Sequence, residues 1–237
     1  MKKLSSILAL SFLCIASVMA QSAEELVQKH LDAIGGAAAW KKLSSIQMST
    51  QTSVMGMEIP TMVYIQSPNK MRSETKIQDK SIVMVYDGKD AWSVNPLMGS
   101  TKAEKLPESA VEEFQKQADL GGPLVDYTAK GSTVELLGDD ELDGTEVYKL
   151  NLKEKDGTVT TFFIEKDSYM ILKSATRKMS NGQEVEGASE YSDYREVEGL
   201  KFPFTTTMGS SGQTMTSKVV KIELNKAIEE KLFTKPE

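Results

Sequence analysis

The chain has 237 residues, of which 40% are hydrophobic and 26% are charged, and its formal net charge at pH 7 is −6. This negative charge disfavours binding to nucleic acid and to anionic lipid headgroups, because both attract basic surfaces. With a single histidine and a single cysteine, the chain also lacks the cysteine and histidine ligands of a zinc site.

Residues 1–20 have the pattern of a secretory signal peptide. Lys2 and Lys3 precede an apolar stretch from Leu4 to Val18, and Ala20 closes a cleavage site. The apolar stretch is shorter than the roughly 20 residues that a membrane-spanning helix needs. We therefore expect a periplasmic protein whose signal peptide is cleaved near Ala20, and we expect residues 21–237 to form a single domain.

The first segment after the leader is predicted to be a helix, from Ser22 to Ile34. Ser22 is a candidate N-cap with Glu25 three residues later, and Gly35-Gly36 is a stop signal. Its one histidine, His30, is expected to face solvent or to cap the helix rather than to act as a base. The apolar positions at helical spacing are Leu26, Val27, Leu31 and Ile34.

Apolar runs in the first half of the domain predict strands. They lie at residues 43–54, 58–66, 69–77, 81–86 and 91–94. In the fourth run, every residue from Ile82 to Tyr86 is apolar, whereas a strand with one solvated face alternates apolar and polar residues. Either helices cover the second face of this strand, or the strand lines a dry cavity.

Two further helices are predicted. Residues 107–118 begin with proline, and Val111, Phe114 and Ala118 lie on one face. A short helix is expected near residues 227–231.

Turn signals recur at regular intervals in the second half. They are Asp143-Gly144, Asp156-Gly157, Asp167-Ser168, Asn181-Gly182, Glu198-Gly199 and Ser211-Gly212. Asn-Gly and Asp-Gly between apolar runs favour tight hairpins, because such turns need positive φ at both central residues. About ten long antiparallel strands with few helices predict a mainly β (α+β) fold whose concave face the helices cover only in part.

The residues that could carry chemistry are few. The acidic run Asp139-Asp140-Glu141 lacks the ligand spacing of a calcium loop. We expect no catalytic residue, metal or cofactor, and the enzymatic alternative is a hydrolase whose two carboxylates come from distant strands. An excess of methionine in residues 48–98 instead favours an adaptable apolar cavity.

Three segments resemble the LolA-like periplasmic lipoprotein carrier family, whose members are also called outer-membrane lipoprotein-sorting proteins. Residues 81–96 (SIVMVYDGKDAWSVNP) resemble a strand, an Asp-Gly-Lys turn, a tryptophan and an Asn-Pro segment of that family. Residues 64–72 (YIQSPNKMR) look like its Pro-Asn hairpin, and residues 193–203 (DYREVEGLKFP) look like a later hairpin. The resemblance implies a curved, incomplete antiparallel β-barrel with helices capping an apolar concave face that holds acyl chains.

The resemblance also suggests a site and partners. We expect a monomer that binds the acyl chains of lipoproteins or other lipids, meets inner- and outer-membrane lipoprotein-sorting proteins, and acts as a chaperone in outer-membrane biogenesis. The expected ligand-binding residues are Met48, Met62, Tyr64, Met84, Tyr86, Phe114, Leu124 and Phe163. Because Phe162 and Phe163 point to opposite faces of a strand, at most one of the two can line the cavity.

One departure from the family concerns the lid. The arginine that stands before Pro-Asn in the lipoprotein carrier and latches its lid is Ser67 here, and Arg72 across the turn is the candidate substitute. Two other functions fit the same sequence: a lipid- or lipoprotein-sensing domain of the envelope that uses the same cavity, and a structural envelope protein whose cavity is simply core.

Overall fold

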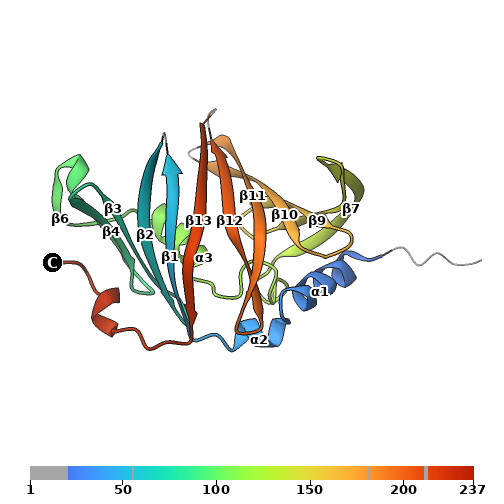
Figure 1. Ribbon diagram of the computed structural model, residues 1–237, viewed down its shortest axis with the longest axis horizontal. Helices are drawn as coiled ribbons and strands as arrows, with labels where there is room; N and C mark the ends of the chain where they lie inside the picture. The colour runs from blue at the N-terminus through green and yellow to red at the C-terminus, as the bar shows by residue number, and fades with distance from the viewer. Residues whose placement is uncertain (1–20, 55, 181, 211–212) are drawn as a thin grey trace, which may run out of the picture.

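The computed structural model describes residues 21–54, 56–180, 182–210 and 213–237. The predicted signal peptide lies outside the described residues, as do Asn181 and the Ser211-Gly212 turn. The described chain forms one thirteen-stranded antiparallel sheet (Figure 1). The mainly β, incomplete-barrel fold predicted from the sequence is confirmed, with more strands than expected.

The strands divide into two meanders. The first comprises β1 (Ser45–Val54), β2 (Met57–Gln66), β3 (Lys70–Ile77), β4 (Lys80–Tyr86), β5 (Ala91–Asn95) and β6 (Ser100–Lys105). The second comprises β7 (Thr133–Leu142), β8 (Thr145–Lys153), β9 (Val159–Glu165), β10 (Ile171–Ser180), β11 (Gln183–Val197), β12 (Leu200–Ser210) and β13 (Gln213–Leu224).

A single long-range pairing joins the two meanders. β1 pairs with β13, with Ile46 opposite Leu224 and Met48 opposite Ile222. Every other pair of neighbouring strands is consecutive in the chain, and the sheet ends at β6 on one side and at β7 on the other. The sheet is therefore curved but open.

Turn chemistry explains the hairpins. Asp143 and Gly144 have φ values of 49° and 83°, and Glu198 and Gly199 have φ values of 50° and 84°. These paired positive values suit tight hairpins, as the sequence predicts.

The helices largely follow the predicted pattern. Helix α1 (Ala23–Ala33) has the expected capping box between Ser22 and Glu25, and α3 (Glu108–Gln117) begins after Pro107. The expected C-terminal helix is a 3₁₀ turn, η2 (Glu230–Phe233). Helix α2 (Ala37–Lys41) and the turn η1 (Pro96–Met98) were not predicted.

Gly35 fixes the joint between α1 and α2 against the sheet. The Lys201 amide donates to the Ile34 carbonyl oxygen at 3.0 Å, so this joint lies on the β11–β12 hairpin. A Cβ atom on Gly35 would come within 2.3 Å of the Gly199 carbonyl oxygen. The glycine that stops the helix therefore also permits the close approach of the two backbones.

Both long helices lie on the same face of the sheet, which we call the helix face. Three buried apolar clusters hold them there. Leu26 of α1 packs with Leu150 and Phe162, Phe114 of α3 packs with Met71 and Tyr86, and a central cluster joins β1, β12 and β13. The helix face thus carries most of the core.

The opposite face, the outer face, is covered at β3 and β4 by the C-terminal segment after β13, whose turn η2 contacts both strands. Arg72 Nη1 donates to the Leu232 carbonyl oxygen at 3.1 Å. Val85, which pairs with Arg72 and so shares the outer face, is fully buried, and Phe233 is only 1% exposed.

This covering explains why β4 is apolar at nearly every position. Tyr86 faces α3 on one side, and Val85 faces the C-terminal segment on the other. Of the two explanations left open by the sequence, cover on the second face applies here, although the cover is a chain tail rather than a helix.

Candidate functional site

The strand register separates four of the expected ligand-binding residues, which are Met62, Tyr64, Met84 and Tyr86. Tyr64 pairs with Arg72, and Arg72 pairs with Val85, so Tyr64 and its i−2 neighbour Met62 lie on the outer face. Tyr86 pairs with Met71, beneath α3. The expectation that Met62 and Tyr64 bind one ligand together with Met84 and Tyr86 is therefore wrong. Strands β2 and β3 pair even positions with even ones, whereas β3 and β4 pair odd positions with even ones, so the even positions of β2 and β4 lie on opposite faces.

The paired phenylalanines of β9 show the same alternation. Phe162 is buried beneath α1, whereas Phe163 lies on the outer face and contacts the Lys149 ammonium group, 5.7 Å from the ring centre. Phe162 is the one on the helix face, so the prediction that Phe163 lines a cavity beneath the helices is wrong.

The other expected site residues do lie on the helix face, but in separate clusters. Phe114 stacks on Tyr86 with ring centres 6.5 Å apart, and Met84 beside them is 37% exposed. Met48 packs in the central cluster, and Leu124 packs against α1. These residues therefore do not line one cavity.

The hollow on the helix face lies between α1, α2, the segment 119–124 and strands β9–β12. It has a volume of about 300 Å³. Its lining comprises His30, Leu31, Ile34, Trp40, Asp119, Leu120, Gly121, Gly122, Pro123, Leu124, Phe162, Ile171, Tyr191, Tyr194, Lys201 and Pro203. Leu124 is the only residue of the expected set that lines it.

The polar groups of the aromatic side chains in the wall of this hollow are hydrogen-bonded to the protein itself, and the charged side chains of its lining are Asp119 and Lys201. Tyr194 Oη donates to the Ile171 carbonyl oxygen at 2.8 Å, and Tyr191 Oη lies 3.0 Å from Ser174 Oγ. The indole nitrogen of Trp40 donates to the carbonyl oxygen of Ile34 at 3.2 Å. Burial raises the pKa of Tyr194 far above its ordinary value, which keeps the hydroxyl neutral. The wall therefore presents mainly carbon to the hollow.

His30 belongs to this wall, contrary to the expectation that it faces solvent. It is 5% exposed, and Nδ1 donates to the Tyr169 carbonyl oxygen at 2.8 Å. Burial lowers the pKa of His30, and the hydrogen bond to Tyr169 offsets this only in part. Its position four residues after Leu26 and three after Val27 already puts it on the apolar side of α1, a signal that sequence reasoning missed.

Ion pairs tether α3 to the second meander. Lys116 Nζ lies 2.7 Å from Glu154 and 2.8 Å from Asp156, both in the β8–β9 connection. Glu113 pairs with Lys178 of β10 at 2.6 Å. Arg72, the candidate substitute for the missing lid arginine, instead binds Glu74 and Leu232 on the outer face, so it does not reach α3.

No group of three or more histidine, cysteine, aspartate or glutamate side chains in the described part of the chain is arranged to hold a metal ion. Among the described helices, none combines the length and apolar character needed to cross a membrane.

Comparisons with known proteins agree on the fold. A family model described as an uncharacterized protein matches residues 61–237. No curated protein matches the sequence significantly.

Solved structures share the architecture at low sequence identity. A LolA superfamily protein from Nitrosomonas europaea is 17% identical with a TM-score of 0.60, over 91% of this chain and 99% of that one. A DUF1329 family protein from Desulfovibrio piger is 12% identical with a TM-score of 0.60, over 88% and 97%. A domain from Vibrio parahaemolyticus with a suggested role in outer-membrane lipoprotein sorting is 12% identical with a TM-score of 0.57, over 89% and 95%. The fold is therefore LolA-like.

Proposed function

The chain belongs to the family whose model matches residues 61–237, and from this membership and the LolA-like fold we propose that it is a periplasmic carrier of lipid chains. It binds the acyl chains of lipoproteins, or of another lipid, in the hollow on the helix face and moves them towards the outer membrane. No step of this function requires catalysis.

One observation carries the proposal, namely that the aromatic side chains in the wall of the hollow that carry a polar group are hydrogen-bonded to the protein. An acyl chain can offer them no hydrogen bond, so a wall with unpaired hydroxyl groups would disfavour it. Tyr191, Tyr194 and Trp40 already have protein partners, which leaves their ring faces for apolar contact. Each methylene group transferred from water to such a surface stabilises the complex by about 0.8 kcal/mol.

Loading and release need an opening on the helix face. The segment 119–124 forms one wall of the hollow and directly follows α3. Exposed ion pairs are worth about 0–1 kcal/mol each, so the tethers from Lys116 and Lys178 add little to the buried Phe114 contact that anchors α3. Movement of the segment 119–124 beside an anchored α3 exposes the hollow.

The direct test is to identify the lipid that the protein carries when it is isolated from the cell. The full chain is purified from the cell envelope without detergent exchange, and the bound lipids are identified by native mass spectrometry. A carrier retains lipid or acylated peptide in a fixed ratio. Protein that is free of lipid under conditions where a known lipid-binding protein keeps its cargo would contradict the proposal.

Substitutions in the wall test whether the hollow is the binding site. Leu120→Asp and Ile171→Asp introduce a charge into partly buried positions of the wall, and we expect them to abolish binding of a fluorescent fatty acid. Met98→Asp is the matched control, since Met98 is 84% exposed and lies outside the hollow. Equal binding by all three variants, each with a native circular dichroism spectrum, would refute the site.

Depletion of the protein in the cell distinguishes a carrier from a sensor that uses the same hollow. Depletion of a carrier leaves acylated proteins in the inner membrane, whereas depletion of a sensor changes a stress response alone. Fractionation of the two membranes after depletion distinguishes these outcomes.

A further inference from the structure

A second hollow lies on the outer face of β7–β12, on the opposite side of the sheet from the proposed acyl site. Its volume is about 510 Å³. Small residues on adjacent strands leave the space open: Ala175, Ala188 and Gly209 line it, and a Cβ atom on Gly209 would meet no atom within 4 Å. Leu137 and Phe163 add apolar surface to its walls.

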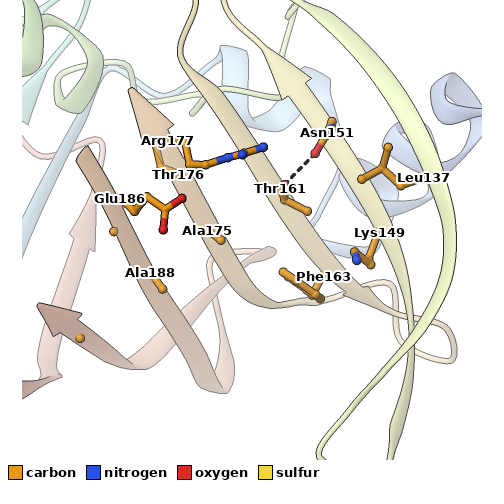
Figure 2. A pocket seen from close by; sticks show the side chains of 12 residues that line it. Leu137, Lys149, Asn151, Thr161, Phe163, Ala175, Thr176, Arg177, Glu186 and Ala188 are labelled. Carbon is orange, nitrogen blue, oxygen red and sulfur yellow. Dashed lines mark hydrogen bonds between the residues drawn. The ribbon is translucent and has the colours of Figure 1, made fainter. Parts of the chain in front are cut away.

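Two hydrogen-bond donors converge at one end of this hollow (Figure 2). The Arg177 side chain extends across β9 towards Thr161 and Asn151. The Thr161 hydroxyl donates to Asn151 Oδ1 at 2.7 Å, which leaves the amide nitrogen of Asn151 available as a donor. Among the residues drawn in Figure 2, the one hydrogen bond joins Thr161 and Asn151, so the Arg177 guanidinium and the Asn151 amide nitrogen have no partner among these described residues.

The negative charge at the hollow lies apart from these donors. Glu186 stands directly opposite Arg177 in the β10–β11 register, yet Arg177 extends the other way, over β9 (Figure 2). Lys149 is already paired with Asp140 at 3.2 Å and lies over the Phe163 ring. The Arg177 guanidinium and the Asn151 amide therefore form the end of the hollow that can bind an anion. The Glu186 carboxylate, on the other wall, repels anions.

We propose that this outer hollow binds a small amphipathic oxyanion, a carboxylate or a phosphate attached to a compact apolar group. The guanidinium fork and the Asn151 amide hold the oxyanion, because planar guanidinium groups match the geometry of carboxylate and phosphate oxygens. The apolar group lies on Phe163, Leu137 and the alanine floor. The site is separate from the acyl hollow, so it does not depend on the proposed carrier function.

The test uses a matched series of probes on the full mature chain. Binding of 3-phenylpropionate and phenyl phosphate is measured by backbone amide shifts in NMR spectra, with 3-phenylpropanol as the neutral analogue and inorganic phosphate as the anion without an apolar group. We expect saturable binding of one or both aryl oxyanions, with shifts confined to β8–β11, and weaker binding of the alcohol and of inorganic phosphate. The tighter of the two aryl probes identifies the anion class.

Two substitutions should act in opposite directions. Arg177→Gln removes a charged donor and should weaken binding about tenfold. Glu186→Gln removes a repelling charge and should tighten binding several-fold. Lys76→Gln, on the exposed part of β3, changes the net charge as Arg177→Gln does and should leave binding unchanged.

Three results would overturn the proposal. They are binding of the alcohol as tight as that of the acid, equal effects of Arg177→Gln and Lys76→Gln, and probe-induced shifts that map to the helix face. Since Arg177, Glu186 and Lys76 are exposed, all three variants should fold, and their melting temperatures verify this.

Discussion

His30 Nδ1 donates a hydrogen bond to the carbonyl oxygen of Tyr169 at 2.8 Å, which ties the last turn of α1 to the β9–β10 turn in the wall of the hollow on the helix face. The imidazole is buried, and burial holds its pKa below the ordinary value of 6.5. The charged form of this side chain is therefore disfavoured in the folded protein.

The first prediction concerns pH. Since the pKa is lower in the folded state, the unfolded state binds more protons below about pH 6.5, and the free energy of unfolding should fall as pH decreases through this value. Urea unfolding between pH 8 and pH 5 measures this slope. His30→Gln keeps a donor for Tyr169 without a titrating group, so the variant should lose most of the slope near pH 6. An unchanged slope would assign the pH dependence to other groups.

The second prediction concerns the anchor of α3. Phe114 is buried against Tyr86, so Phe114→Ala should lower the free energy of unfolding by about 3 kcal/mol or more. Phe114→Leu keeps most of the apolar volume and should cost less. Chemical denaturation compares the two variants, and hydrogen exchange of α3 should increase more in the alanine variant. If both substitutions lower the free energy of unfolding by less than about 0.5 kcal/mol, as ordinary surface substitutions do, α3 is not anchored by this contact.

The third prediction concerns Asp156. Burial of its carboxyl group opposes ionisation, but hydrogen bonds from Lys116 and Thr158 outweigh burial and lower its pKa to about 2. Stability from this carboxylate is present above the unfolded pKa and is lost as pH falls towards 2.

Lys116→Gln should raise the pKa of Asp156 towards 3.8, the ordinary value. NMR titration of the carboxyl carbon measures this change. Lys130→Gln removes a lysine that pairs with Asp119 instead and is the control. A pKa of Asp156 that is the same in both variants would show that Lys116 does not hold the carboxylate.

The fourth prediction compares two adjacent glycines. Both Gly35 and Gly36 have positive φ, of 111° and 90°, so alanine at either position introduces backbone strain of about 1–3 kcal/mol. Only Gly35→Ala adds a clash with the Gly199 carbonyl oxygen, whereas Gly36 has open space. Gly35→Ala should therefore unfold at lower denaturant concentration and weaken fatty-acid binding, because the α1–α2 joint forms part of the hollow. Equal stability of the two variants would contradict the close approach.

Much of the local structure follows from short-range signals. The capping box at Ser22 and Glu25 and the Asp143-Gly144 turn depend on residues close together in the chain, and both formed as predicted. Helix α2 could not be predicted from the sequence, because its five residues are too few for a recognisable apolar period.

The site was harder to predict than the fold. Side chains alternate along a strand, so a shift of one residue moves every side chain to the other face. In β2, this alternation puts Met62 and Tyr64 on the outer face, although both were expected to bind a ligand on the helix face. The apolar pattern of a strand covered on both sides does not distinguish the two faces.

The sequence by itself determined most of the strands, the main turns, two helices and the curved antiparallel architecture, because these depend largely on propensity and periodicity within about fifteen residues. Only the tertiary structure decided which face each side chain occupies, where the C-terminal tail covers the sheet, and which residues meet around the hollow. The wall joins His30 of α1, Trp40 of α2 and Tyr194 of β11, which are far apart in the chain. Their meeting depends on the β1–β13 pairing and on the packing of α1 against β8 and β9, and no local pattern encodes these contacts.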